Sequence, residues 1–343
     1  MKIIVTHSSP DMDAITSVWL IRKYLPGWEN SIVKFVPAGE RLNNSGAEVA
    51  HENSLVRNAK PQSSSSQSLT PLVRTGENFV GSPRPIEIVG YDEIIHVDTG
   101  LGPLDHHQTA DDNVCGASLT FDFVKRIQNS EFRVQSSEKW KDRMEAISRM
   151  VKVVVDIDHF KEVFHKDPLA DYHEFDLAGI LDGLKLQFPG QDEYYVVEIS
   201  KCLDAVLHGF ENRIWAEKEI AENGQKFETR FGKGMGFETI NDSVIKLAQK
   251  MGYVIVVRKD PRKGYVRIKA LPALRSLRQL SRAAKEVDID LTLAYEKLRK
   301  MDPEATWFLH VGKKMLLNGS VKNPKMRPTK LSLDQIIKVL EKV

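Results

Sequence analysis

Short apolar runs alternate with polar loops over the first forty residues of the chain. The β-branched run from Ile3 to His7 predicts a buried strand that ends at the turn-like sequence SSPD. From Asp13 to Leu25 apolar residues recur every three or four positions, which is typical of a helix, and Pro26-Gly27 ends it. Ser31 to Val36 predicts a second strand. Strand, helix and strand in this order predict a βαβ unit with parallel strands.

The hydrophobic pattern disappears from about residue 43 to residue 85, a stretch that contains Ser63-Ser64-Ser65-Ser66. A loop this long inside a compact domain is usually disordered or functional, and we interpret it as a disordered or partly ordered insertion, with a functional lid as the alternative. Two strands follow the insertion, Ile86 to Val89 and Glu93 to Asp98.

The rest of the chain changes from a helical period to short strands at about residue 225. The periodicity predicts helices at 117–127, 137–155, 194–223 and 331–340. Strands are expected at 252–257, 264–270, 306–311 and 314–317, the first two forming an antiparallel hairpin around DPRKG. The predicted fold class is α/β: an N-terminal parallel-sheet domain at 1–190 that carries the insertion, a connecting helix at 191–224, and a smaller C-terminal α+β domain at 225–343.

Composition limits the class of protein. The 343 residues suggest two domains, and 49 Lys and Arg against 47 Asp and Glu give a formal charge of +2. This balance excludes a strongly basic nucleic-acid coat but allows a local basic groove. No apolar run approaches the ~20 residues that cross a bilayer, so we expect no membrane partner. Cys115 and Cys202 form no CxxC pair and the N-terminus does not read as a signal peptide, which favours a cytoplasmic protein.

Carboxylates and imidazoles stand at the ends of the predicted elements. They come from three segments: His7, Asp11 and Asp13; Asp98, Asp105, His106 and His107; Asp156 and Asp158. Because the carboxyl ends of parallel strands line one crevice, we expect these side chains to converge there.

Several carboxylates cannot ionise together at close range without a compensating cation. Carboxylate and imidazole ligands without a thiolate suit Mn²⁺ or Mg²⁺, and also accept Zn²⁺, Fe²⁺ or Co²⁺. The number of candidate ligands exceeds one tetrahedral site and fits two ions about 3.5–4 Å apart, an arrangement that activates water and clamps a phosphoryl group. The sequence therefore predicts two divalent metal ions as cofactors, Mn²⁺ foremost, and phosphoester hydrolysis.

The motifs HSSPDMDA, HVDTG and LDHHQ, followed by a helix-terminal Asp, resemble the four motifs of the DHH phosphoesterase superfamily. That superfamily includes manganese-dependent inorganic pyrophosphatases, oligoribonucleases and single-strand exonucleases. The spacing of the middle motifs and the C-terminal half most resemble the melanocyte-proliferating-gene exonuclease branch. The first motif departs from that branch at Asp11 and at Asp13-Ala14, and is nearer the pyrophosphatase and oligoribonuclease type.

The resemblance implies a ligand set. His7 and Asp11 would bind one metal, Asp13 and His106 the other, and Asp98 would bridge the two. A helix-end aspartate would complete the first metal. Asp156 and Asp158 would face about 200° apart on a helix, so only one of them is expected to be a ligand.

The resemblance also implies roles for the neighbours of His106. His107 would face the scissile phosphate as general acid or charge stabiliser, and Asp105 would orient an imidazole by accepting its N–H. Structural alternatives exist for other polar residues. Asp11 and Asp13 could cap the first helix, and we interpret His96 as a packed residue rather than a ligand. His159 and His165 read as surface residues.

The C-terminal domain offers a candidate phosphate-binding segment. His310 lies in a predicted strand and is followed by Lys314, Asn318, Gly319 and Ser320, whose donors and glycine backbone suit an anionic substrate; a plain basic turn is the alternative. Arg267 and Lys269 alternate with apolar residues and project from one face, either toward the substrate or toward solvent.

These patterns predict a metal-dependent hydrolase, such as a 3'-5' exonuclease or an enzyme acting on very short RNA. Its favoured substrate is a short single-stranded RNA or DNA, hydrolysed to mononucleotides. A small-molecule phosphohydrolase acting on pyrophosphate or a cyclic dinucleotide is the first alternative, and a non-catalytic nucleotide-binding regulator is the second. A homodimer is compatible with the sequence.

Overall fold

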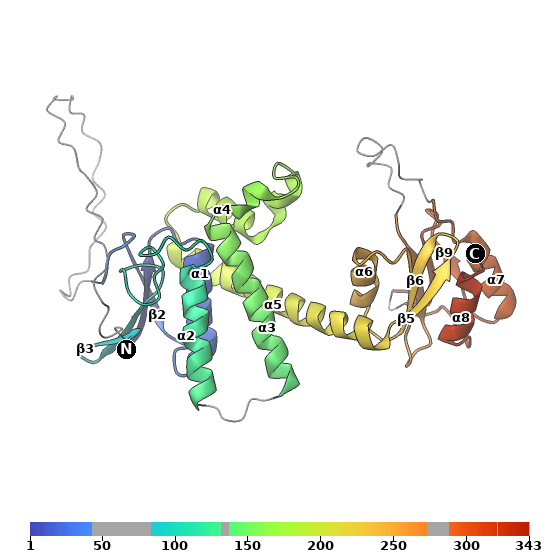
Figure 1. Cartoon of the computed structure of the whole chain (residues 1–343), viewed down its shortest axis with the longest axis horizontal. Coiled ribbons are helices and arrows are strands. Elements are labelled where there is room, and N and C mark those ends of the chain that lie inside the picture. Colours follow the sequence, from blue (N-terminus) through green and yellow to red (C-terminus); the bar gives the residue numbers. More distant parts are fainter. Residues whose placement is uncertain (43–83, 132–136, 273–287, 321, 343) are drawn as a thin grey trace. The chain divides into compact units, whose positions relative to one another are not determined.

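The chain forms two compact units. The computed structural model describes residues 1–42, 84–131, 137–272, 288–320 and 322–342 (Figure 1). Unit 1 comprises Met1–Leu207 and unit 2 comprises His208–Val343, so the division falls inside the long helix α5 (Asp192–Asn223). The Ser-rich insertion expected at 43–85 lies outside the described residues, apart from its last two positions.

Unit 1 is built on a four-stranded sheet in the order β2-β1-β4-β3. The strands are β1 (Lys2–His7), β2 (Ile32–Val36), β3 (Ile86–Val89) and β4 (Asp92–His96). β1 pairs in parallel with both β2 and β4, whereas β3 returns antiparallel along β4. Helix α1 (Met12–Tyr24) connects β1 to β2, so the predicted βαβ unit is confirmed.

Helices cover this sheet and fix the loops that follow its strands. Helix α1 packs against β1, α2 (Gly116–Glu131) and α3 (Glu138–Asp158). Its side chains are almost all buried, including Ile15, Val18 and Ile21, because it lies between the sheet and two helices. Two short 3-10 helices, η1 (Lys161–Phe164) and η2 (Asp171–Phe175), and α4 (Leu177–Gln187) then lead to α5.

Unit 2 contains a six-stranded sheet in the order β5-β6-β7-β8-β10-β9. The strands are β5 (Gln225–Thr229), β6 (Gly232–Glu238), β7 (Ile255–Lys259), β8 (Val266–Ala270), β9 (Phe308–Leu309) and β10 (Met315–Asn318). The antiparallel β7–β8 hairpin is confirmed. β6 pairs in parallel with β7 through α6 (Ser243–Lys250), a second βαβ unit that the sequence pattern did not predict.

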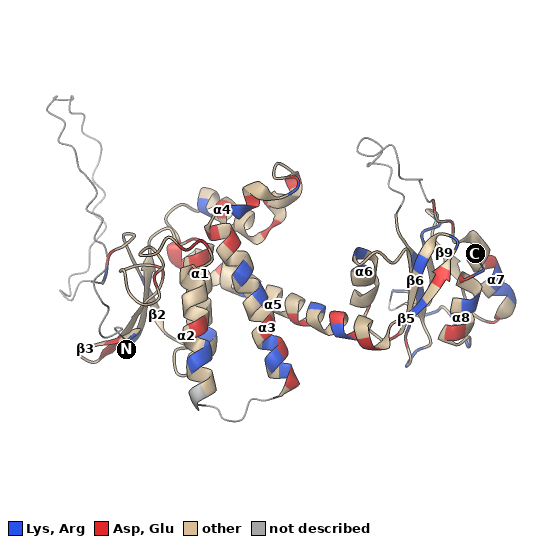
Figure 2. Cartoon of the chain, viewed as in Figure 1, with Lys and Arg blue, Asp and Glu red and all other residues tan. Residues whose placement is uncertain are grey.

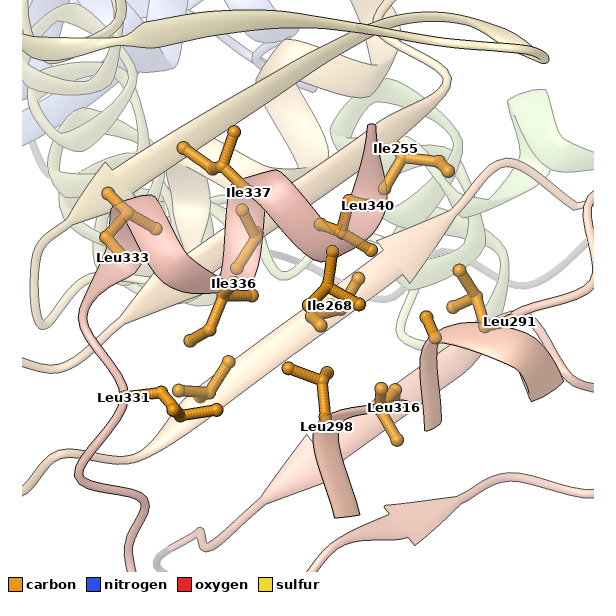
Figure 3. Close-up of a cluster of buried hydrophobic side chains, with 14 of the residues drawn as sticks. Ile255, Ile268, Leu291, Leu298, Leu316, Leu331, Leu333, Ile336, Ile337 and Leu340 are labelled. Carbon is orange, nitrogen blue, oxygen red and sulfur yellow. The ribbon is translucent and has the colours of Figure 1, made fainter. Parts of the chain in front are cut away.

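Helices cover the two faces of this sheet unequally. On one face α7 (Thr292–Met301) and α8 (Leu333–Leu340) bury a large apolar cluster, in which Ile336 and Leu340 of α8 lie near Ile268 and Leu298 of α7 lies near Leu316 (Figure 3). On the other face the apolar cluster joins α6 and the end of α5 to Met235, Phe237 and Val256 of β6 and β7. The side chains of β8, β10 and β9 that share this second face are not part of that cluster and include the half-exposed Phe308.

Two strand predictions in unit 2 need correction. The strand expected at 252–257 begins only at Ile255, because Gly252, with a φ of +97°, ends the α6 segment. The strand expected at 306–311 is reduced to Phe308–Leu309, because the backbone N–H of Lys313 donates to His310 O at 2.7 Å and turns the chain.

The hydropathy of the helices bears on the prediction that the chain contains no membrane-spanning segment. Among the described residues, the structure holds no helix with both the length and the apolar character that a membrane span requires.

Candidate metal centre

The first loop of unit 1 brings three of the predicted ligands to the carboxyl end of β1. His7 is the last residue of β1, and Asp11 caps α1 by accepting the Ala14 N–H at 3.0 Å. Asp13 follows in the first turn of α1 and is 1% exposed. The capping role considered for Asp11 is therefore real, and its second carboxylate oxygen still lies 3.7 Å from His7 Nε2.

Asp98 lies at the centre of the cluster. It follows β4 with a φ of +52°, a left-handed conformation that asparagine and aspartate tolerate better than most residues. Its backbone N–H donates to Leu104 O at 2.9 Å, which closes the loop that carries His106 and His107. Its two carboxylate oxygens point to different imidazoles: Oδ2 lies 3.2 Å from His7 Nε2 and Oδ1 lies 3.5 Å from His106 Nε2.

The nitrogen His106 Nε2 faces three carboxylates at once. Besides Asp98, it lies 3.7 Å from Asp13 Oδ2 and 3.6 Å from Asp158 Oδ2. The atoms of His7, Asp11 and Asp98 form one group of potential ligands, and those of Asp98, His106 and His107 form another. A third group joins His106, Asp158 and His159. Asp98 belongs to the first two groups, so its carboxylate could serve two cation sites.

The pKa values of the two imidazoles show how strongly the cluster attracts positive charge. Burial lowers the pKa of His7, but its contacts with Asp11, Asp98 and Ser8 O outweigh this effect and raise the pKa to about 10. The close approach of Asp98, with the charges of Asp158 and Asp13, raises the pKa of His106 to about 9 against the effect of burial. Protons therefore hold these nitrogens when no other cation does, and bound metal would have to displace them.

The pKa values of two carboxylates in the cluster are raised as well, which for an acid means that the charged form is disfavoured. Burial and the charge of Asp98 raise the pKa of Asp13 well above its ordinary value, and burial also raises the pKa of Asp158. Asp98 Oδ1 and Asp158 Oδ2 are buried and receive no hydrogen bond from the described part of the chain. Buried carboxylate oxygens without donors are costly unless a cation lies between them, so this donor set fits divalent metal ions.

The structure separates the two aspartates at the end of α3. The Asp158 carboxylate faces His106 and its side chain is 13% exposed. The Asp156 carboxylate lies 3.6 Å from Lys161 Nζ on the other side of the helix and is 43% exposed. Of the two candidates, only Asp158 is therefore brought into the cluster.

Asp105 and His107 form a pair at the edge of the cluster. The buried Asp105 carboxylate lies 2.6 Å from His107 Nδ1 and accepts the backbone N–H groups of Leu101 and His107. Burial opposes the shift, but these hydrogen bonds lower the pKa of Asp105. The imidazole that Asp105 orients is thus that of His107, whose side chain is 53% exposed and whose Nε2 is left for other contacts.

Gly116 and Ala117, which the sequence motifs did not indicate, hold Asp13 in place. Asp13 accepts the N–H groups of Gly116 and Ala117 at the start of α2, where the helix dipole favours a carboxylate. A Cβ on Gly116 would lie 2.9 Å from Asp13 Oδ2 and 2.9 Å from Asp98 Cβ. Only a glycine therefore lets the start of α2 approach both carboxylates, a requirement that appears only in three dimensions.

Histidines near the centre differ in their roles. His96 is buried, accepts the Leu42 N–H at 3.1 Å and stays outside the cluster, as expected of a packed residue. Burial and the nearby Arg41 lower the pKa of His96. His159, expected at the surface, instead lies 3.7 Å from Asp158, and its Nε2 is 2.9 Å from Val114 O. The sequence offered no signal for this contact because Val114 comes from a distant loop.

A cavity of about 220 Å³ adjoins the centre between α1, the end of α3 and α4. Asp11, Asp13 and Asp158 line it, together with Phe160 and Lys185. Lys185 Nζ donates to Ser9 O at 3.2 Å. Burial alone would raise the pKa of Asp11, but the contact with His7 and the charge of Lys185 outweigh burial and lower it. Lys185 is a cation beside the acidic cluster that sequence spacing could not place.

The C-terminal residues expected to bind substrate do not act together. Asn318 is fully buried, and its amide group bonds to Thr306 O, Arg327 O and the Thr329 N–H, so the expectation that it contacts substrate is wrong. Lys314 Nζ binds Asp288 and Ile289 O and so ties its strand to the segment before α7, whereas His310 Nδ1 accepts the Gly312 N–H within its own turn. Gly319 and Ser320 do line a groove in unit 2.

Comparisons with known proteins add no family assignment. No protein-family model matches the sequence, and a search of curated proteins finds no match.

The close approach at Gly116 makes a sharp prediction about metal binding. Gly116→Ala should displace Asp13 and Asp98 and weaken Mn²⁺ binding at least tenfold by calorimetric titration, because the new Cβ overlaps the Asp13 carboxylate and Cβ of Asp98. Gly102→Ala is the matched control: it lies in the same loop region, and its Cβ would meet only Arg41 Nη1 at 3.5 Å. Equal Mn²⁺ affinity in the two variants would contradict this geometry.

Proposed function

We propose that unit 1 is a DHH-type phosphoesterase domain that uses two divalent metal ions, Mn²⁺ foremost, to hydrolyse phosphoesters. The observation that carries the proposal is the position of Asp98, whose two oxygens face His7 and His106 while the other carboxylates gather around the same two nitrogens. The motifs that resemble the DHH superfamily supply the chemical class. The pair of ions would activate a water molecule and neutralise charge on the phosphoryl group.

The donor groups suggest how the residues divide between the two ions. His7, Asp11 and Asp98 would hold one ion, since their ligand atoms form one compact group. Asp98, Asp13 and His106 would hold the other. Asp158 was expected beside His7, but its nearest imidazole is His106, so we assign it to the second ion. Backbone donors at Gly116 and Ala117 keep Asp13 oriented toward His106.

His107 is proposed as the proton donor to the leaving oxygen. Asp105 accepts from Nδ1–H, so a proton delivered to the leaving oxygen would come from Nε2 of the imidazolium form, and the neutral imidazole that remains would keep its proton on Nδ1. The same logic makes Asp105 a positioning residue, because it acts through His107. Lys185, beside Asp11 in the adjoining cavity, is placed to attract an anionic group of the substrate.

The favoured substrate class is a short single-stranded RNA or DNA. Pyrophosphate is retained as the second candidate because the first motif, with Asp11 and Asp13-Ala14, resembles the pyrophosphatase type. Hydrolysis of a short oligoribonucleotide, of an activated phosphodiester and of pyrophosphate, each with Mn²⁺ added, tests the proposal directly. If none of the three substrates yields product, the enzymatic assignment is contradicted and a nucleotide-binding regulator is favoured.

The two α3 aspartates provide an internal test of the ligand set. Asp158→Asn should lower Mn²⁺ occupancy and turnover, because it removes a buried charge that faces His106. Asp156→Asn is the same change two residues away, and it should leave both quantities within twofold of wild type because its ion pair with Lys161 is largely solvated. Metal analysis and Mn²⁺-dependent hydrolysis of an activated phosphodiester measure both effects. If Asp156→Asn causes the larger loss, the assignment of Asp158 is wrong.

Adjacent histidines should give different defects. His106→Ala should lower metal content, because Nε2 faces the carboxylates of the cluster. His107→Ala should retain the metal and slow turnover by roughly 10²–10⁴-fold, the usual range for a general acid. Asp105→Asn should reproduce part of the His107 defect, again with full metal content, because it weakens the contact that orients Nδ1. Equal metal loss in the His106 and His107 variants would reject this division of roles.

A further inference from the structure

One half of a sheet face in unit 2 carries charged and apolar side chains, of which Phe308 is half-exposed whereas Arg258 and Leu317 are buried. The strand register aligns Phe237, Arg258, Arg267, Leu317 and Phe308 in one row across β6, β7, β8, β10 and β9. Phe237 at one end of the row is fully buried in the cluster with α6, whereas Phe308 at the other end is 48% exposed. The row therefore runs from a covered half of the face to an open half.

The open half forms a groove of about 570 Å³ with an excess of positive charge. Its lining includes six cationic residues: Arg258, Arg262, Lys263, Arg267, Lys269 and Lys322. The lining also includes two carboxylates, those of Asp242 and Asp260. Lys and Arg appear in blue on the strands of this sheet in Figure 2. The groove thus carries a formal charge of +4 in a chain whose formal charge is +2.

The arginines neutralise both carboxylates and leave the lysines available. Asp242 accepts from Arg258 Nε at 2.9 Å and also pairs with Arg267. The Asp260 carboxylate lies 3.9 Å from Arg258 Nη1 and 3.9 Å from Arg262 Nε, and it also accepts the backbone N–H groups of Arg262 and Lys263. Lys263 Nζ lies over the Tyr265 ring, 5.9 Å from its centroid. Within the described residues, Lys269 and Lys322 form no ion pair, so these two lysines can contact a polyanion.

Apolar side chains lie between these cations. Tyr265, Met315 and Leu317 line the groove, and Phe308 extends the same face by its register with Leu317. A Cβ on Gly319 would lie 2.2 Å from the Tyr265 ring, so the ring packs directly over the glycine backbone. Cations that alternate with aromatic and apolar side chains match a ligand whose phosphates alternate with flat bases.

We propose that this groove binds single-stranded nucleic acid, with the lysines contacting phosphates and the aromatic and apolar side chains contacting bases. A sheet face is too broad to enter the grooves of a duplex, which admit a helix or a two-stranded ribbon. Pyrophosphate would satisfy the cations but not the apolar surface. Naming the bound strand as the substrate rests on the function proposed for unit 1, whereas binding itself does not.

The test is direct binding by the full chain after metal removal with EDTA. Fluorescence anisotropy with a labelled single-stranded RNA of about ten nucleotides should show binding that weakens as salt rises. Lys269→Glu and, separately, Lys322→Glu should each weaken binding at least about tenfold, and should lower the slope of log K against log salt by about 0.7 for each phosphate that the variant no longer neutralises. Lys338→Glu is the matched control, since this exposed lysine lies on α8, which covers the opposite face of the sheet. Thermal melting should show that all three variants remain folded.

Several results would overturn the inference. These are no binding at low salt, an equal loss of affinity in Lys338→Glu, or equally tight binding of a duplex of the same length or of polyglutamate. Displacement of the RNA by pyrophosphate at equal phosphate concentration would point instead to a small phosphate ligand. Because the measurement uses no metal, its outcome does not depend on metal binding by unit 1. Strand binding without Mn²⁺-dependent turnover would reject the proposed function alone, and turnover without strand binding would reject the groove alone.

Discussion

Repulsion among buried carboxylates is the constraint on which the organisation of unit 1 depends. Asp13 and Asp98 are almost inaccessible to solvent, and Asp158 lies beside the same imidazole as both of them. Elevated pKa values at His7 and His106 are the direct consequence, because each nitrogen is held among negative charges. Such an arrangement lowers the stability of the metal-free protein. A divalent cation bound among the carboxylates would relieve their repulsion, and this relief would favour its binding.

The fold supplies the means to hold these groups together. Parallel pairing of β1 with β4 brings the ends of two strands, and hence His7 and Asp98, to one edge of the sheet. The amino end of α2 then provides the N–H groups that fix Asp13. Asp105 and His107 lie at the edge of this cluster, and the His107 imidazole is half-exposed. The arrangement places potential metal ligands inside and a potential proton donor at the rim, as hydrolysis of a phosphoester would require.

Local patterns were enough to predict the first βαβ unit, the β7–β8 hairpin and the segments that carry the acidic cluster. These features depend on period and on turn residues, which are properties of neighbouring positions. The choice between Asp156 and Asp158 was not predictable, since it depends on the rotation of α3 against the loop of His106. β6 was missed because three glycines in GKGMGFE weaken its strand pattern.

The errors in unit 2 also arise because local patterns do not contain contacts between segments that are distant in sequence. Asn318 looked like a substrate ligand because it is polar and precedes a glycine, yet its side-chain amide bonds to three backbone groups inside the unit, those of Thr306, Arg327 and Thr329. The cations of the groove come from β7, the turn after it, β8 and the loop after β10, and only the register of the sheet brings them together. No short stretch of sequence contains that information.

The central claim is that Asp98 is shared by two metal ions. The most direct measurement is the metal stoichiometry of wild type and Asp98→Asn after loading with Mn²⁺, combined with turnover of an activated phosphodiester. We expect two ions per chain in wild type, and in Asp98→Asn the loss of at least one ion and of turnover, with thermal melting of the metal-free proteins showing that the fold is retained. Two retained ions in Asp98→Asn, with turnover within about tenfold of wild type, would contradict the central claim.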